Sequence, residues 1–164
     1  MKYRRLTKEQ LEELHPEFIN FLATQTITAA EWEDIKASKP EVAEQELDVF
    51  SDLVWEGVLT QAAYLEHISP QTMNLFHLEE EQMNLISVMI GDELIDITTK
   101  EGYAWLQKNL MDDTVKLFTA TKKYSDDPNG DKFKLIEQGA VITKGNLYNY
   151  FEDLMELGKE KNGF

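Results

Sequence analysis

The chain has 164 residues, 42% of them hydrophobic, which is enough to bury a core without disulfides or metals. Its net charge of −15 argues against direct binding to nucleic acid, and its lack of cysteine excludes disulfides, thiolate metal sites and cysteine nucleophiles. The N-terminus lacks the apolar segment of a signal peptide, and no apolar run approaches the roughly 20 residues of a membrane span. We therefore expect a cytoplasmic protein that makes no membrane contact.

Residues 1–57 are predicted to be mainly helical. Thr7 with Gln10, and Thr28 with Glu31, have the spacing of capping boxes, in which paired side chains satisfy the first free amides of a helix. Pro16 separates a short first helix from a second one, because proline is tolerated only in the first turn.

A fourth helix is predicted to begin at Pro40 and to end at Gly57. Its most unusual feature is a row of acidic side chains that recur every four residues: Glu44, Asp48, Asp52 and Glu56. Neighbours in such a row lie about 6 Å apart along the helix axis and repel each other. The row is either a solvated face or a docking surface for a basic protein partner. If it is only solvated, lysine at positions 48 and 52 should stabilise the helix by on the order of 1 kcal/mol.

From residue 58 the pattern changes to short alternating segments, which predict three antiparallel strands in a meander. In this arrangement Ile68 pairs near Met73, so that His67 faces Asn74. A single helix over residues 70–90 is the alternative, because Ser69 and Pro70 together are typical of a helix start and Gly91 is typical of a helix end.

The C-terminal third is predicted to contain two helices and a hairpin. Thr98 should cap the first helix, and Thr143 should cap the second, which Gly158 should end. Between them, residues 114–124 and 133–143 should form two strands that are joined by a turn over residues 125–132.

The predicted fold class is α+β, with a helical N-terminal half packed on an antiparallel sheet of about five strands and with a C-terminal helix. We expect a single domain over residues 1–164. Its parts are a mainly helical segment, residues 1–57; a sheet with two helices, residues 58–157; and a mobile tail, residues 158–164.

The densest group of potential metal ligands is His77 with Glu79, Glu80 and Glu81. On a helix, His77, Glu80 and Glu81 would share a face, whereas on a strand Glu80 points away from His77 and Glu79. The strand prediction therefore favours a solvated acidic turn, and we expect no metal and no cofactor here. These four residues remain the candidates for a metal site if the helix forms.

Other catalytic patterns are not present in the sequence. There is no nucleophile elbow and no glycine-rich phosphate loop. Asp127, Asn129 and Asp131 alternate as in a calcium loop, but the glycine precedes Asp131 and the twelfth position is Gln138. We therefore predict no catalytic residue.

The segments MKYRRLTKEQLEELHPEFINFLATQTI, GYAWLQKNL and LIEQGAVITKG resemble a family of small acidic single-domain bacterial proteins of unknown function, of the Bacteroidota type. The resemblance extends over nearly the whole chain. It implies a bacterial single-domain protein and supplies no activity, ligand or catalytic residue.

The function predicted from these features is that of a non-enzymatic binding or adaptor protein, whose acidic surface contacts a basic protein partner. One alternative is a metal-dependent hydrolase that uses His77 and the neighbouring glutamates. Another is a nucleic-acid mimic that occupies the groove of a basic protein. The oligomeric state stays open.

Overall fold

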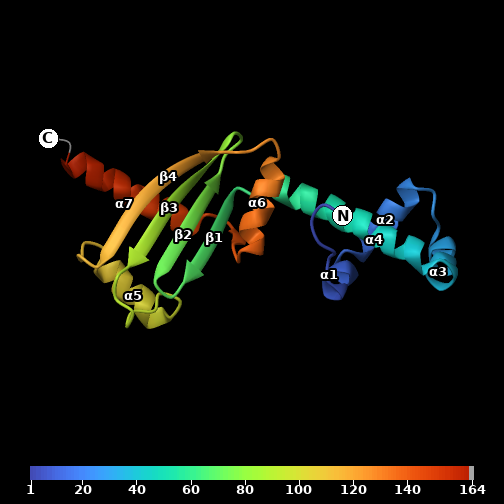
Figure 1. Cartoon of the computed structure of the whole chain (residues 1–164), viewed down its shortest axis with the longest axis horizontal. Helices are drawn as coiled ribbons and strands as arrows, with labels where there is room; N and C mark the ends of the chain where they lie inside the picture. The colour runs from blue at the N-terminus through green and yellow to red at the C-terminus, as the bar shows by residue number, and fades with distance from the viewer. Residues whose placement is uncertain (163–164) are drawn as a thin grey trace. The chain divides into compact units, whose positions relative to one another are not determined.

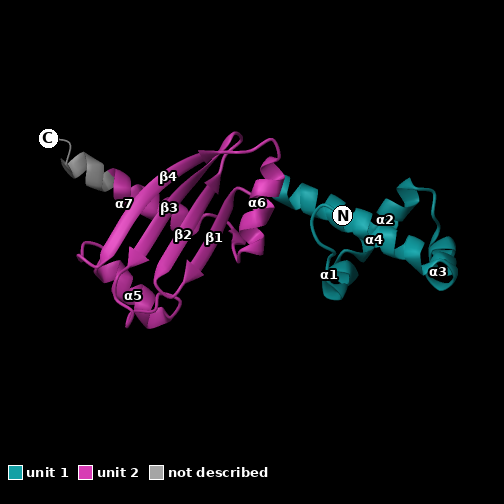
Figure 2. Ribbon diagram, viewed as in Figure 1, with its two compact units in different colours: residues 1–60 teal, residues 61–164 magenta. Residues whose placement is uncertain are grey.

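The computed structural model describes the backbone of residues 1–162 and the side chains of residues 1–156. The chain forms two compact units, Met1–Thr60 and Gln61–Phe164 (Figure 2). Within the described residues there are seven helices and a five-stranded antiparallel sheet, which confirms the α+β class and the helical N-terminal half. The expectation of a single domain stays a prediction. The expected mobile tail, residues 158–164, lies outside the described side chains.

The first unit consists of four helices (Figure 1). Both predicted capping boxes are formed in it. Thr7 and Thr28 each accept a hydrogen bond from the third residue of the following helix. The helices are α1 (Lys8–Glu13), α2 (His15–Thr24), α3 (Ala29–Ser38) and α4 (Pro40–Gln61).

An aromatic cluster forms the core of this unit. The ring of Phe18 lies 5.1 Å from that of Trp32 and 5.1 Å from that of Phe50, with edge-to-face geometry in both pairs. Leu22 is only 1% exposed beside them. Because these residues come from α2, α3 and α4, the three helices hold each other in place.

The predicted end of the fourth helix at Gly57 is wrong, because α4 continues to Gln61. Gly57 does not adopt the left-handed conformation in which glycine ends a helix. Leu59, in the last turn of α4, is completely buried. Burial of this side chain favours helical continuation past the glycine.

The second unit is built on an antiparallel sheet whose strand order is β4-β3-β2-β1-β5. Figure 1 labels the first four of these strands. The predicted meander is confirmed, with Ile68 opposite Met73 and His67 opposite Asn74, so the alternative helix over residues 70–90 is wrong. The strands are β1 (Tyr64–Ser69), β2 (Thr72–Leu78), β3 (Gln82–Ile90), β4 (Val115–Lys123) and β5 (Val141–Thr143).

Different helices cover the two faces of this sheet. Helices α5 (Lys100–Lys108) and α7 (Asn146–Asn162) pack on one face, where Leu75 and Val88 are completely buried. On the other face Leu65 and Met83 are buried with partly buried side chains of α6 (Pro128–Glu137). Alternation of side chains along each strand separates these two sets.

The predicted hairpin over residues 114–143 is wrong in its second half. The first strand forms as β4, but the expected turn and return strand form α6 instead. Asp127 caps α6, and Phe133 is buried, which favours the helix over a solvated turn. Gly139 ends that segment at φ 113°, and the short β5 then pairs with β1 at the opposite edge of the sheet.

Two predicted helix starts and one helix end are displaced. Thr99, not Thr98, caps α5 by accepting a hydrogen bond from Gly102. Helix α7 begins at Asn146, because Thr143 instead bonds the amide of Gly145, and the helix continues past Gly158.

Gly57→Ala should stabilise the protein, because Gly57 lies inside α4 and an added Cβ meets nothing within 4 Å. We expect a gain of about 0.5–1 kcal/mol in the free energy of unfolding, measured by urea denaturation. Gly145→Ala is the matched control and should destabilise, because Gly145 has φ 83° and an added Cβ would lie 2.5 Å from the Tyr64 ring. Destabilisation by Gly57→Ala would mean that α4 ends at Gly57 after all.

Candidate functional site

The predicted row of carboxylates, Glu44, Asp48, Asp52 and Glu56, lies along α4 and is called the acidic ridge below. The structure places residues 2–6, the N-terminal segment, against this ridge. The guanidinium of Arg5 donates to Asp48 Oδ1 from Nε at 2.7 Å and also bonds Glu44. These bonds raise the pKa of Arg5, with the bond to Asp48 as the largest cause.

The C-terminal half of the ridge binds the backbone of the same segment. Asp52 accepts one bond from the amide nitrogen of Lys2 at 2.6 Å and one from that of Tyr3 at 2.9 Å. Glu56 accepts a bond from the Tyr3 hydroxyl and lies 3.7 Å from the Lys2 ammonium. Burial, and then the bond to Glu56, raise the pKa of Tyr3.

A buried anchor fixes the end of the N-terminal segment. Leu6 is 7% exposed in the core of the helical unit, and its amide donates to Ser51 Oγ at 3.0 Å. Ser51 is completely buried and in turn donates to the carbonyl of Leu47 at 2.7 Å. The ridge therefore already holds a basic segment of this chain, which the sequence analysis missed.

The other candidate group, around His77, lies on the sheet. The imidazole of His77 stacks on the Tyr64 ring, with centroids 4.7 Å apart, and the ring of Tyr148 from α7 lies 5.4 Å away. His77 Nδ1 is 3.8 Å from Glu79 Oε1, which is longer than a hydrogen bond. The histidine thus packs mainly as an aromatic side chain.

Glu79, Glu80 and Glu81 lie in the turn between β2 and β3, with exposed side chains. The carbonyl of Glu79 accepts a bond from the Tyr124 hydroxyl at 2.9 Å. Among the described residues, no three histidine, aspartate or glutamate side chains come together in a metal-binding group.

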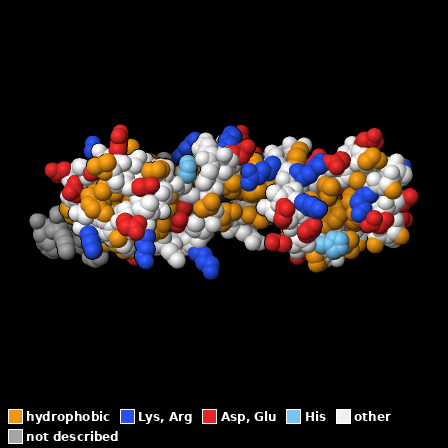
Figure 3. All heavy atoms as spheres, turned by 90° about the horizontal axis from the view of Figure 1, so that it is seen from below, with side chains coloured by type: hydrophobic (Ala, Val, Ile, Leu, Met, Phe, Trp, Pro, Cys, Tyr) orange, Lys and Arg blue, Asp and Glu red, His pale blue; other side chains and the backbone are white. Residues whose placement is uncertain are grey.

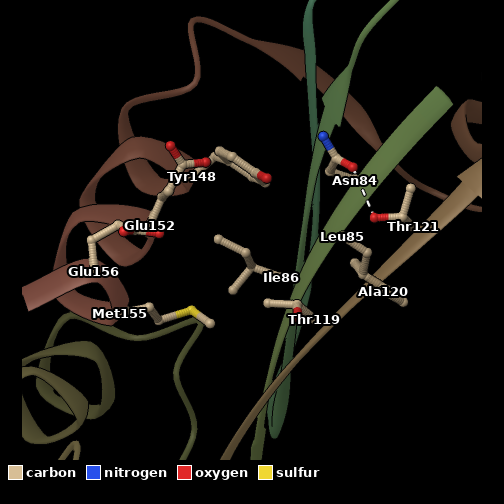
Figure 4. A pocket seen from close by; sticks show the side chains of 10 residues that line it. All are labelled: Asn84, Leu85, Ile86, Thr119, Ala120, Thr121, Tyr148, Glu152, Met155 and Glu156. Carbon is tan, nitrogen blue, oxygen red and sulfur yellow. Dashed lines mark hydrogen bonds between the residues drawn. The ribbon is translucent and has the colours of Figure 1, made fainter. Parts of the chain in front are cut away.

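A cleft of about 370 Å³ lies between α7 and strands β3 and β4 (Figure 4). Its polar side includes Asn84, whose side-chain oxygen bonds the Thr121 hydroxyl at 3.0 Å. Tyr148 and Glu152 enter it from α7, and burial, and then the charge of Glu152, raise the pKa of Tyr148 to about 12. The phenol therefore stays protonated at neutral pH and can donate a hydrogen bond.

The helical unit has a groove of its own, of about 580 Å³. Phe18 and Trp32 are among the apolar side chains on its walls, and Glu12, Glu33 and Lys36 are among the charged side chains that line it. Figure 3 shows hydrophobic side chains gathered on the helical unit with charged side chains of both signs around them. This mixed border gives the groove no preference for a ligand of one charge.

One carboxylate of the sheet, that of Glu66, is partly buried and forms no ion pair with any described residue. Glu66 of β1 points to the face that α5 and α7 cover, because it pairs with Leu75. Burial raises its pKa, and a hydrogen bond with Thr143 opposes the shift. Burial is the main cause of the raised pKa of Tyr103 on α5, and the charge of Glu66 contributes less.

Residues 1–156 match the model of a family of unknown function, DUF6495. The chain belongs to this family. The match confirms the resemblance to a family of unknown function that the sequence motifs carried. No curated protein and no solved structure matches this DUF6495 chain significantly. No helix among its described residues combines the length and hydrophobicity that crossing a membrane requires.

Because the acidic ridge is paired with the N-terminal segment, lysine at positions 48 and 52 should lower the stability of the protein. A solvated ridge would have predicted the opposite. Asp48→Lys with Asp52→Lys removes the Arg5 ion pair and two backbone hydrogen bonds, and it places a lysine against Arg5. We expect a loss of about 1 kcal/mol in the free energy of unfolding, because exposed ion pairs contribute up to about 1 kcal/mol each. Gln45→Lys on the same helix is the control and should not destabilise. A more stable double variant would mean that the ridge is a solvated face.

Glu66→Gln should stabilise the protein at pH 7. Because the folded state raises the pKa of Glu66 above its ordinary 4.5, stability falls as pH rises through that raised value. The gain should disappear at pH 3, where the carboxyl is protonated in both states. Thermal unfolding at the two pH values measures this, with exposed Glu93→Gln as the control. An equal gain at both pH values would rule out titration as the cause.

Proposed function

We propose that this DUF6495 protein is a non-enzymatic binding protein, and that its acidic ridge receives a basic segment of a protein partner. The observation that carries the proposal is the bound N-terminal segment. Arg5 bridges Glu44 and Asp48, while Asp52 accepts two backbone amides. Backbone amides occur in any peptide segment and guanidinium groups in any segment that contains arginine, so an arginine-containing partner brings the same donors.

The charge of the helical unit supports a basic partner. Residues 1–60 carry 6 basic and 13 acidic side chains, a net charge of −7. Such a surface attracts cationic segments over about a Debye length and speeds their encounter. The ridge adds directional hydrogen bonds to this general attraction. Two of its acceptors, Asp48 and Asp52, are only partly exposed.

The N-terminal segment would act as a tethered competitor for the ridge. Its ion pairs are largely exposed and contribute little each, so the basic end can detach while Leu6 stays buried. Tethering through a short connection gives it an effective concentration in the millimolar range. A partner therefore has to bind more tightly than Lys2 and Arg5 do, which would exclude weakly basic proteins.

No observation favours the two alternative functions over this one. His77, the imidazole of the predicted hydrolase, is stacked on Tyr64 and lies next to Tyr148. We propose a bacterial cytoplasmic setting, which the lack of cysteine fits.

The proposal predicts that opening the ridge creates a binding site for a basic peptide. Lys2→Ala with Arg5→Ala in the full chain removes the competing charges. The probe is a fluorescent, C-terminally amidated peptide with the sequence of residues 1–6. We expect it to bind this open variant on the order of tenfold more tightly than the unmodified chain, by anisotropy in 50 mM salt, which corresponds to about 1.4 kcal/mol.

Two further variants make that experiment decisive. Adding Glu44→Gln and Asp48→Asn to the open variant should abolish binding, because both partners of Arg5 are lost. Adding Glu17→Gln and Asp34→Asn, two exposed carboxylates outside α4, removes the same charge and should leave most of the binding. Equal losses in both variants would show unspecific attraction and would contradict a ridge site.

A further inference from the structure

We propose that the outer edge of β4 accepts an extended acidic segment of a protein partner as an added strand. This site differs from the acidic ridge in place and in charge, and it does not rest on the ridge proposal. Strand β4 is the first strand of the sheet order and, within the described residues, pairs only with β3. Eight of its nine residues are exposed.

An unpaired strand of this length is a template for pairing with another chain, because a row of backbone amides and carbonyls lacks partners. Nine residues exceed the usual five to six of a strand. The central part, residues 117–121, has no charged side chain that would discourage pairing. Leu117 and Phe118 are 37% and 46% exposed there, on opposite faces of the sheet.

The charges on β4 indicate the chemistry of the partner. In a chain of net charge −15, this strand carries Lys116, Lys122 and Lys123 and no acidic residue. Lys116 and Lys122 are six residues apart, so they point to the same face, about 20 Å apart. An added strand with acidic side chains six residues apart would place one opposite each lysine.

The same lysines argue against a second copy of this chain as the occupant. Antiparallel pairing of two β4 strands about Thr119 would place Lys116 of one copy opposite Lys122 of the other, at both ends. Like charges directly opposite each other destabilise a strand pair. A partner of opposite charge meets no such repulsion.

The cleft beside α7 lies on the face of the sheet opposite Lys116 and Lys122, and there it adds selectivity for the partner's side chains. Thr119 and Thr121 of β4 line this cleft together with Ile86 of β3 and Met155 of α7 (Figure 4). Side chains of an added strand that point to this face would lie next to the two threonines. Aliphatic side chains fit there, because Ile86 and Met155 offer apolar surface. Alternate side chains of the partner would thus contact the lysines on one face and the cleft on the other. Known strand-addition sites also obtain specificity from contacts to alternate side chains.

The test uses the full chain and a designed probe, the blocked peptide Glu-Val-Thr-Val-Thr-Val-Glu. Its glutamates are six residues apart on one face, and its valines lie on the other. We expect slower hydrogen exchange of β4 amides and NMR shift changes confined to β4 and the cleft. A twin peptide with lysine in place of glutamate should bind at least tenfold more weakly.

Charge reversal on the protein tests the assignment of the lysines. Lys116→Glu with Lys122→Glu should reverse the preference, so that the lysine peptide binds more tightly than the glutamate peptide. Lys100→Glu with Lys144→Glu changes the same charge at exposed positions outside β4 and should keep the original preference. Equal effects of the two double variants would overturn the proposal.

Methylation of peptide amides distinguishes strand addition from charge attraction alone. Alternate amides of the bound peptide point to opposite edges of its strand. One probe is methylated on the amides of one edge, and a second probe on the amides of the other edge. Only the probe whose methylated edge faces β4 should lose binding. Equal affinity of the two methylated probes would overturn the proposal. So would a concentration-dependent dimer that protects β4 without peptide, since it would make a second copy the occupant.

Discussion

Antiparallel pairing of β1, β2 and β3 is the constraint on which the second unit depends. Its register places Tyr64, His77 and Asn84 in one row, on the face that α7 covers. The alternation that buries Leu75 and Val88 therefore also turns His77 toward Tyr148 and leaves the following glutamates in a solvated turn. The sheet ends at β4 on one side and at β5, which pairs with β1, on the other. Because β5 lies beside β1, it leaves the outer side of β4 as an edge.

In the helical unit, an unfavourable local pattern becomes favourable through a distant contact. Neighbouring carboxylates of the ridge repel each other by roughly 0.2–0.5 kcal/mol per pair in an isolated helix. Arg5, 39 residues from Glu44, relieves this repulsion by bonding to both Glu44 and Asp48. The ridge is thus one half of a contact between oppositely charged segments. Its carboxylates accept both a guanidinium and backbone amides of the N-terminal segment.

Sequence reasoning succeeded where the signals are local. The capping boxes at Thr7 and Thr28 and the pairing of Ile68 with Met73 follow from neighbouring residues and turn positions. It failed where burial against distant residues decides. Phe133 is buried in a helix although its segment alternates like a strand, and Leu59 carries α4 past a glycine. The partner of the ridge was missed because Arg5 and Glu44 are far apart in the sequence, although their opposite charges were a usable signal.

The two proposed surfaces differ in charge, and this difference limits what each can bind. The acidic ridge repels an acidic segment, while the lysines of β4 repel a basic one, so neither partner competes for the other's site. The exposed edge of β4 is also a feature that does not stabilise this chain by itself, because its outer backbone groups offer pairing to another strand. Together, the two proposals describe a chain that would hold one basic and one acidic segment at the same time, as an adaptor does.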